Sequence, residues 1–515
     1  MERQAAGVNG GDIKTALSDE ARSHARSAEA VDAEKQPEPD VGSSAPSTAE
    51  QHQPPVVDDP MRWSAARKWT VTLGACYFSS LISVAASAYS LGIDAMVRDL
   101  AEPRLLLVAG ISAFTLSCAL LPLILAPLSE AVGRRYVYLV SYAIFFLFFL
   151  PVALAQNAAT VLVARFLCGA AGSVGSTMVG GTLGDIWLKE ERTLPMALFA
   201  LSALAGTPMG PVGFAWATID GRWRWIHWTM LLLGAPSMLF ALLFLNRETL
   251  PKKLLQRSGL PDGAQSLQSR MAKLRGALSV SAIRPLRFLF TEPITTVLCI
   301  WISFAWGCLY LFLQSVPLVF AQHGFRDENG TTGLAFVGLA VGAVLGFLAY
   351  VFSTRRWPMQ KTHAPEARLR EACVGGVLFA AAFFFYAWTT LPRLPWAVPQ
   401  IASALLMAGL FLFYVSIFQY FGDIYGSYTS SALAAQSFSR NIFATAFPLF
   451  ARRMYQALDY QIATTVLAGI AAVLALSPFL LLRVGARLRA ASPFAVKLEA
   501  EAEAEARAQP GRDRQ

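Results

Sequence analysis

Charged residues are scarce in this 515-residue chain, since Asp, Glu, Lys and Arg make up 15% of it and hydrophobic residues make up 55%. Soluble domains carry roughly 25% charged residues, so this composition excludes an ordinary soluble protein. The five histidines show no zinc-ligand spacing, and the six cysteines all lie inside or at the ends of apolar segments. We therefore expect no bound metal, and cysteines that are buried as small apolar side chains rather than paired in disulfides.

Catalytic motifs are also missing. The chain has no Gly-x-x-x-x-Gly-Lys-Ser/Thr phosphate loop, no Gly-x-Ser-x-Gly elbow, no zinc-binding helix and no dinucleotide-binding turn. The sequence therefore predicts no catalytic residue, no cofactor and no enzymatic activity, and it argues against transport driven by ATP. The net charge of +9 does not indicate nucleic-acid binding, because the basic residues are scattered among short segments between apolar runs.

Twelve apolar runs, each about long enough to cross a hydrocarbon core as a helix, dominate the sequence. They lie at Thr70–Gly92, Leu105–Pro127, Val137–Ala155, Thr160–Leu183, Pro195–Thr218, Trp228–Leu245, Pro293–Val319, Gly333–Phe352, Ala372–Leu391, Trp396–Phe418, Ser430–Phe450 and Ile462–Leu482. The fold predicted is an all-α membrane protein with twelve transmembrane helices in two six-helix bundles. Such a layout is typical of transporters built from repeats, with a substrate site between the halves.

The polar segments define the predicted domains and the orientation. Five ranges result: a disordered cytosolic tail (1–68), a first bundle (69–246), a cytosolic linker (247–292), a second bundle (293–483) and a cytosolic tail (484–515). Lys and Arg are far more numerous in the segments that are cytosolic when both termini lie inside, which predicts that orientation. Asn329, in the sequon Asn-Gly-Thr, then lies in an outer loop, where it is either glycosylated or a chance match.

The segment between the second and third spans carries the most specific motif. Residues 126–135 read Ala-Pro-Leu-Ser-Glu-Ala-Val-Gly-Arg-Arg, which predicts a short charged turn at the cytosolic face. The segment resembles the loop signature of the major facilitator superfamily, with Ala126 in place of the first glycine and Glu130 in place of the aspartate. The local form is similar to fungal members of the twelve-span drug:proton antiporter group, which includes multidrug and secondary-metabolite exporters. Shorter resemblances to this group extend over roughly residues 65 to 490.

Four residues of this turn form a predicted cytosolic gate: Glu130, Gly133, Arg134 and Arg135. Glu130 can pair with Arg134 and face the positive N-terminal end of the eleventh span when the protein is open to the outside. The alternative is that the turn only sets the membrane orientation, which explains the arginines but not the carboxylate.

The fifth span contains Gly206, Pro208, Gly210 and Pro211, which resemble the antiporter motif Gly-x-x-x-Gly-Pro-x-x-Gly-Gly. The match ends after Pro211, since Phe214 and Ala215 stand where the paired glycines belong. Prolines bend a membrane helix and glycines allow close packing, so these four residues form a predicted hinge. A helix that only packs tightly is the alternative.

A few polar and aromatic residues in and beside the spans are candidates for coupling and for the substrate cavity: Arg165, Asp185, Trp301, Trp306, Tyr310, Arg440 and Asn441. Arg165 corresponds to the family arginine that is linked to proton coupling, and it and Arg440 are expected to face the central cavity. No span carries a carboxylate near its middle, so the proton carrier is not evident and the substrate is expected to be neutral or anionic.

The function predicted is a proton-coupled secondary active transporter that exports a small organic molecule, such as a secondary metabolite, organic acid or drug, by alternating access. Its partners are the substrate, protons and the lipid bilayer, and the protein is expected to act as a monomer. The plasma membrane is its expected location, with the vacuole or another internal membrane as the alternative. An uptake permease and a non-transporting membrane sensor remain as other interpretations.

Overall fold

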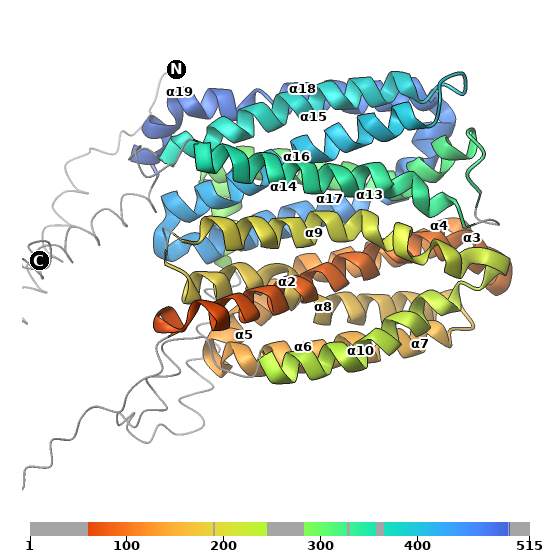
Figure 1. The fold of residues 1–515 in the computed structure, drawn as a ribbon, viewed down its shortest axis with the longest axis horizontal. Helices are drawn as coiled ribbons and strands as arrows, with labels where there is room; N and C mark the ends of the chain where they lie inside the picture. The colour runs from red at the N-terminus through yellow and green to blue at the C-terminus, as the bar shows by residue number, and fades with distance from the viewer. Residues whose placement is uncertain are drawn as a thin grey trace, which may run out of the picture. The chain divides into compact units, whose positions relative to one another are not determined.

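A computed structural model describes residues 60–188, 191–244, 283–326, 330–356, 365–492 and 494. Within these ranges the regular secondary structure is helical and no strand is present. The long helices lie side by side with their axes roughly parallel, so that their ends gather at two opposite layers (Figure 1).

The first half of the chain forms one group of helices. In chain order they are α2 (Ala65–Ala88), η2 (Tyr89–Gly92), α3 (Ile93–Leu100), α4 (Arg104–Leu120), α5 (Pro122–Val132), α6 (Arg134–Leu147), α7 (Phe149–Ala153), α8 (Ala158–Ile186), α9 (Thr193–Phe214), η3 (Ala215–Gly221) and α10 (Arg224–Phe244). Several spans consist of two consecutive helices, such as α4 with α5.

The second half repeats this arrangement. Its helices are α13 (Pro293–Ala321), η5 (Thr332–Phe336), α14 (Val337–Arg356), η7 (Pro365–Arg368), α15 (Leu369–Thr389), α16 (Ala397–Tyr425), η8 (Gly426–Tyr428), α17 (Thr429–Leu458), α18 (Tyr460–Leu474) and α19 (Ser477–Ala490). Contacts between the halves include α4 against α17 and α9 against α14.

Eleven of the described helical segments are long and apolar enough to cross a membrane, and they coincide with eleven of the twelve predicted spans. The remaining prediction, Ser430–Phe450, lies within the 30-residue helix α17. This helix is long enough, but Arg440 and Asn441 near its middle make it less apolar. The count of twelve depends on α17 and stays a prediction. The cytosolic termini also stay a prediction, because both ends of the chain lie outside the described residues.

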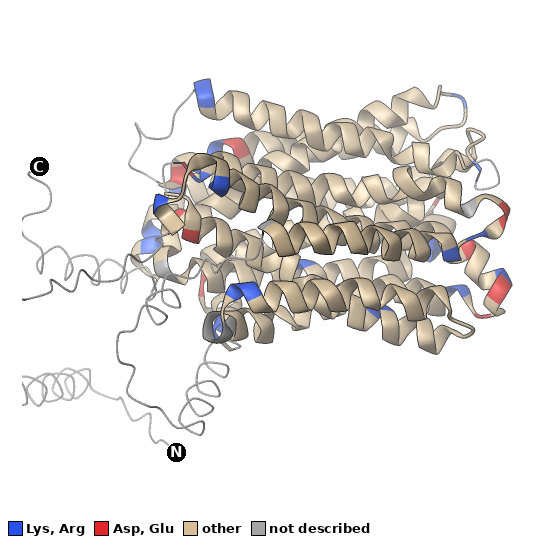
Figure 2. Cartoon of the chain, turned by 60° about the horizontal axis from the view of Figure 1, so that its bottom comes forward, with Lys and Arg blue, Asp and Glu red and all other residues tan. Residues whose placement is uncertain are grey.

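Charged residues concentrate at the two layers of helix ends, and the middle of the helices carries few of them (Figure 2). This distribution matches a chain whose central band lies in hydrocarbon, where an ionised group is costly to bury. All six cysteines are buried and unpaired, as the sequence predicted.

Glycines bring several helices into direct backbone contact. A Cβ atom placed on Gly342 of α14 would lie 2.1 Å from the carbonyl oxygen of Ala404 on α16. Gly375 of α15 and Gly409 of α16 approach each other in the same way, since a Cβ on either would lie within 2.8 Å of the other's carbonyl oxygen. Helix packing in lipid depends on such small residues, so these glycines fix how α16 sits between its neighbours.

The predicted charged turn at residues 126–135 is wrong in its extent. Helix α5 continues to Val132, and α6 begins at Arg134, so that Gly133 alone separates them. Gly133 adopts φ of 113°, a conformation that residues with a Cβ rarely adopt. Its amide donates to the carbonyl of Ser129, which closes the last turn of α5. The reversal therefore needs one glycine rather than a loop.

Described helices extend a few residues beyond three of the predicted domain boundaries, and the division into domains stays a prediction. Helix α2 begins at Ala65, and α19 continues to Ala490. Residues 283–291, at the end of the predicted linker, are helical, and the buried Phe288 ring packs against the rings of Phe494 and Tyr425. Residues 1–59, 245–282 and 495–515 lie outside the described part of the chain.

Candidate functional site

An ion pair joins two helix ends in the first half of the chain. Arg134 begins α6 and Asp185 lies one residue before the end of α8, and their Nε and Oδ2 atoms are 2.7 Å apart. The two side chains are only 11% and 18% exposed, so solvent screens the pair weakly. The guanidinium lies against Gly181, where a Cβ atom would be 2.5 Å from Arg134 Nη1. We name the layer of helix ends that contains this pair the cytosolic end, following the predicted orientation.

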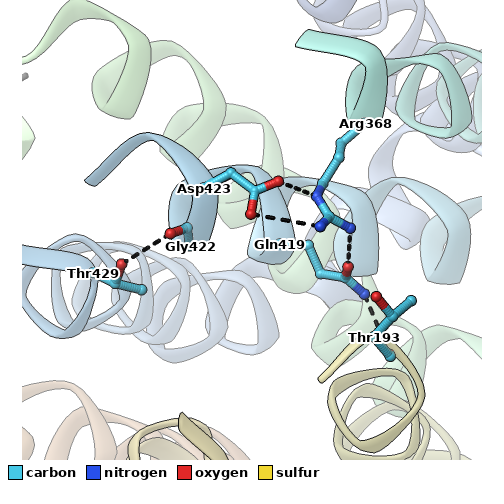
Figure 3. Close-up of polar contacts among 6 residues, drawn as sticks. All are labelled: Thr193, Arg368, Gln419, Gly422, Asp423 and Thr429. Carbon is cyan, nitrogen blue, oxygen red and sulfur yellow. Dashed lines mark hydrogen bonds and ion pairs between the residues drawn. The ribbon is translucent and has the colours of Figure 1, made fainter. Parts of the chain in front are cut away.

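A second ion pair occupies the corresponding place in the other half (Figure 3). Arg368, at the end of η7 just before α15, pairs with Asp423 near the end of α16. Arg368 also donates to the side-chain oxygen of Gln419, and the Gln419 amide donates to the backbone carbonyl of Thr193 at 3.4 Å. Because Thr193 begins α9 in the first half, this hydrogen bond connects the two halves at the cytosolic end.

Both ion pairs line one cavity of about 480 Å³ between the halves. The wall also contains apolar side chains, among them Met178, Phe418 and Leu433, and the small residues Gly181 and Gly184. In each half an arginine near the start of the third predicted span meets an aspartate near the end of the fourth. The cavity is therefore framed by one pair from each repeat, and each pair ties together helices of its own half.

Arg165 is enclosed within the first half. Its side chain has no exposed surface, and its Nε, Nη1 and Nη2 atoms donate to the carbonyls of Gly110, Ala85 and Ala86 at 3.3, 3.0 and 3.3 Å. The guanidinium carbon also lies 4.5 Å from the centre of the Tyr89 ring and 4.5 Å from that of the Phe114 ring. Arg165 lines neither the cytosolic cavity nor a second one of about 790 Å³ at the outer end. In this conformation Arg165 is enclosed and faces neither of these cavities, and its role in coupling stays a prediction.

Arg440 lies where the halves meet, and only 4% of it is exposed. Its guanidinium lies 4.5 Å from the centre of the Trp306 ring, donates from Nη1 to the Tyr414 hydroxyl, and reaches the carbonyl of Ser176 in the other half from Nη2 at 3.5 Å. Asn441 donates to the carbonyl of Cys118, also in the other half, at 3.4 Å. The structure therefore brings Arg440 and Asn441 together at the interface between the halves.

The three predicted aromatic residues of α13 do not form one group. Trp301 and Trp306 are five residues apart, and their side chains leave the helix about 140° apart at 100° per residue. Trp301 stacks on Phe413 inside the second half, with ring centres 4.1 Å apart. Trp306 stacks on Tyr414 at the interface, and Tyr310 is buried one turn further along α13. Of these three aromatic residues, Trp306 is the one whose ring lies against the guanidinium of Arg440.

Comparison with known proteins identifies the family. The sequence profile of the Major Facilitator Superfamily matches residues 73–448. The chain belongs to the major facilitator superfamily. The MFS-type efflux pump MFS2 of Trichophyton rubrum is 32% identical over 484 residues, which cover 90% of this chain and 80% of the pump. Efflux pump atB of Aspergillus terreus is 35% identical over 410 residues, which cover 76% and 85% of the two chains.

Solved structures show the same fold. The proton:xylose symporter XylE covers 82% of this chain and 96% of its own, with a TM-score of 0.58 and 14% identity. The human organic anion transporter MFSD10 covers 81% and 99%, with a TM-score of 0.52 and 18% identity. The protein is thus a multi-pass membrane transporter of the major facilitator superfamily and not an enzyme, as its sequence predicted.

The predicted hinge of this transporter lies on one continuous helix, α9, which contains Pro208 and Pro211. Gly206 and Gly210 face α2 closely, since a Cβ atom on Gly210 would lie 2.7 Å from the carbonyl oxygen of Val84. On the next turn of the helix, a Cβ atom on Gly213 would have no neighbour within 4 Å. The glycines at 206 and 210 therefore hold α9 against α2, and the hinge itself stays a prediction.

Gly210→Ala is expected to lower the thermal unfolding midpoint of the purified transporter, because the added methyl group must push α9 away from α2. Overpacking of this kind costs roughly 1–3 kcal/mol. Gly213→Ala is the matched control and should leave the midpoint unchanged. Equal midpoints for the two variants in a fluorescence-detected melt would show that the α2 contact is looser than the structure indicates.

Two predicted residues cannot be placed. The side chain of Glu130 and the whole of Asn329 lie outside the described part of the chain, so the Glu130 contact and the glycosylation stay predictions. Arg135 follows Arg134 at the start of α6, and its guanidinium lies 5.5 Å from the ring centre of Tyr136.

Sequence reasoning missed Gln419 and Thr193, although both line the cytosolic cavity. The predicted tenth span ended at Phe418, whereas α16 continues for seven more residues to Tyr425. A signal was present, since Gln419 and Asp423 are four residues apart and lie on one face of a helix that ends at Gly426. The apolar run ends at Phe418, and beyond it the residues are too polar for hydrophobicity alone to indicate the last turn of the helix.

Proposed function

We propose that this transporter exports a small organic molecule across the plasma membrane in exchange for protons, by alternating access. The observation that carries the proposal is the pair of matched ion pairs, Arg134 with Asp185 and Arg368 with Asp423, on the two sides of one cytosolic cavity. Export is supported by the relatives, two of which are named efflux pumps. Proton coupling is supported by the absence of an ATP site from the sequence.

Each ion pair joins two helix ends within one half, so it can keep that end of its half rigid while the halves move. A conformational change then has to break only the contacts between the halves. At the cytosolic end, the hydrogen bond from Gln419 to Thr193 is 3.4 Å long, close to the limit for such a bond. We therefore assign the closing of the cytosolic side to Gln419 together with the predicted gate of Glu130, Gly133, Arg134 and Arg135.

Gln419→Ala is expected to favour the state that is open to the cytosol, because it removes a hydrogen bond between the halves worth about 0.5–1.5 kcal/mol. A cysteine introduced at Ala434, which lines the cytosolic cavity, should react with a membrane-impermeant maleimide about threefold faster in inside-out vesicles. Gln322→Ala, at an exposed position near the outer end, is the matched control. An unchanged labelling rate in the Gln419 variant would show that Gln419 does not help to close the cytosolic side.

Export and uptake are distinguished by where the substrate accumulates. Cells that lack the transporter should retain at least one metabolite that wild-type cells release, as measured by mass spectrometry of cells and medium. Inside-out vesicles that contain the protein should then take up that metabolite when their interior is acidified, and a protonophore should stop the uptake. Metabolite loss from the deficient cells would instead support an uptake permease, and no movement in vesicles or liposomes would support a sensor.

A further inference from the structure

We propose that Arg440, Trp306 and Gln436 form a binding site for a carboxylate or similar acceptor group on the transported molecule. This proposal depends on the proposed transport function in one respect, namely that the ligand of the site is the transported substrate. The three residues come from α13 and α17 of the second half and lie against α8 of the first half.

The site lies between the two cavities. Thr177, Phe418 and Ala434 line the cytosolic cavity. Arg440 contacts the carbonyl of Ser176, the residue before Thr177, and Gln436 follows Ala434 by two positions. On the other side, the outer cavity reaches Leu313 and Gln314, about two helical turns from Trp306 on α13. Along α13 and α17, these side chains therefore lie close to residues that line each of the two cavities.

The groups without a partner at this place are all hydrogen-bond donors. Arg440, Trp306 and Gln436 are 4%, 5% and 2% exposed, and within the described part of the chain Arg440 Nε, Trp306 Nε1 and Gln436 Nε2 have no acceptor. A buried donor without an acceptor destabilises the folded protein, because it has lost its hydrogen bonds to water. A ligand that offers only acceptor atoms would satisfy all three, and a carboxylate is the most compact such group.

Arg165 provides an internal comparison, because it too is an arginine buried within a long described helix. Each of its three guanidinium nitrogens donates to a backbone carbonyl of its own half, so every nitrogen already has an acceptor. Arg440 instead uses Nη1 for a hydroxyl and Nη2 for a distant carbonyl, and its Nε is unused. None of the ion pairs between described residues includes Arg440. Because its Nε has no acceptor, the Arg440 guanidinium can bind a carboxylate side-on, by donating hydrogen bonds from Nε and Nη2 to the two carboxylate oxygens.

Binding at this site would also act on the contact between the halves. The Nη2 bond to Ser176 is 3.5 Å long and is one of the polar links from α17 to the first half. A carboxylate that takes over Nη2 would compete with that carbonyl and weaken the link. The anion therefore occupies the place where its binding energy can favour separation of the halves.

The site can be tested by ligand binding to the purified, full-length transporter. Two carboxylates with different apolar bodies, benzoate and octanoate, are compared with the neutral amides benzamide and octanamide and with the cations benzylamine and octylamine. The shift of the thermal unfolding midpoint with ligand concentration gives each affinity. We expect at least one carboxylate to bind, and its amide and amine counterparts to bind about tenfold more weakly or not at all.

Substitutions of Arg440 and Trp306 test whether the carboxylate binds at the proposed site. Arg440→Lys keeps the charge but loses the side-on geometry, and we expect it to weaken carboxylate binding about tenfold. Trp306→Phe keeps the ring and removes only the indole donor, and we expect a loss of about threefold. Arg453→Gln, at an exposed position near the other end of α17, is the control and should bind as the wild type does. Trp306→Phe keeps the test usable if the arginine variant does not fold.

Several results would overturn the proposal: no carboxylate binds to the wild type, the amines bind as well as the acids, or the Arg440 and Trp306 variants bind as the control does. These outcomes are independent of the proposed export. Carboxylate binding that depends on Arg440, without proton-driven movement in vesicles, would refute the export and leave the site. Proton-driven export of a cationic metabolite would leave the export and refute the site.

Discussion

Transport is expected to fall roughly thirtyfold in Gly181→Ala while the yield of folded protein stays unchanged. The added Cβ would lie 2.5 Å from Arg134 Nη1, which is the end of a flexible side chain and can move aside. The guanidinium then leaves its 2.7 Å contact with Asp185, whose carboxylate remains largely buried without that partner. Breaking a buried ion pair costs about 3–5 kcal/mol. Because the Arg134–Asp185 pair retains some exposure to solvent, we expect a loss of about 2 kcal/mol, which corresponds to roughly thirtyfold in transport.

Gly184→Ala is the matched control for this prediction. Gly184 lines the same cavity one turn further along α8, but a Cβ atom there would meet no atom closer than 3.9 Å. The two variants are compared by efflux of the metabolite found in the deletion experiment and by size-exclusion chromatography of the purified proteins. Equal transport by the two variants would show that the ion pair does not support the gate, and a loss of folded Gly181→Ala would show that Arg134 cannot move aside.

Gly342→Ala is expected to prevent accumulation of folded transporter. Its added Cβ would lie 2.1 Å from the backbone oxygen of Ala404, so α14 and α16 would have to separate along their contact. Overpacking costs roughly 1–3 kcal/mol when side chains can adjust, and more is expected here because the obstacle is backbone. The cost also spreads to α15, which packs on α16 through Gly375.

The measurement is the amount of monodisperse protein in detergent and the midpoint of its thermal unfolding. Gly469→Ala on α18 serves as the control, because a Cβ atom there would have no neighbour within 4 Å. We expect the control to match the wild type in both quantities. A normal midpoint for Gly342→Ala would mean that the two helices can move apart at little cost.

Much of the fold follows from local sequence. A helix that crosses the membrane needs an apolar run about as long as the hydrocarbon core is thick. Eleven spans were therefore placed correctly before any contact was known. The polar helix α17 was also placed, by its position in the series of runs. The errors lie at helix ends, where α5 continues to Val132 and α16 to Tyr425, because backbone hydrogen bonds extend a helix past the last apolar residue.

The sequence by itself therefore determined the spans, the two halves and the family, because hydrophobic length and a motif of neighbouring residues are local properties. Only the tertiary structure decided what each charged residue does. Arg165 and Arg440 are both buried arginines of long helices, yet one is satisfied by carbonyls of its own half and the other keeps an unused donor at the interface. Their partners come from other helices, and a linear pattern does not contain the distances between helices.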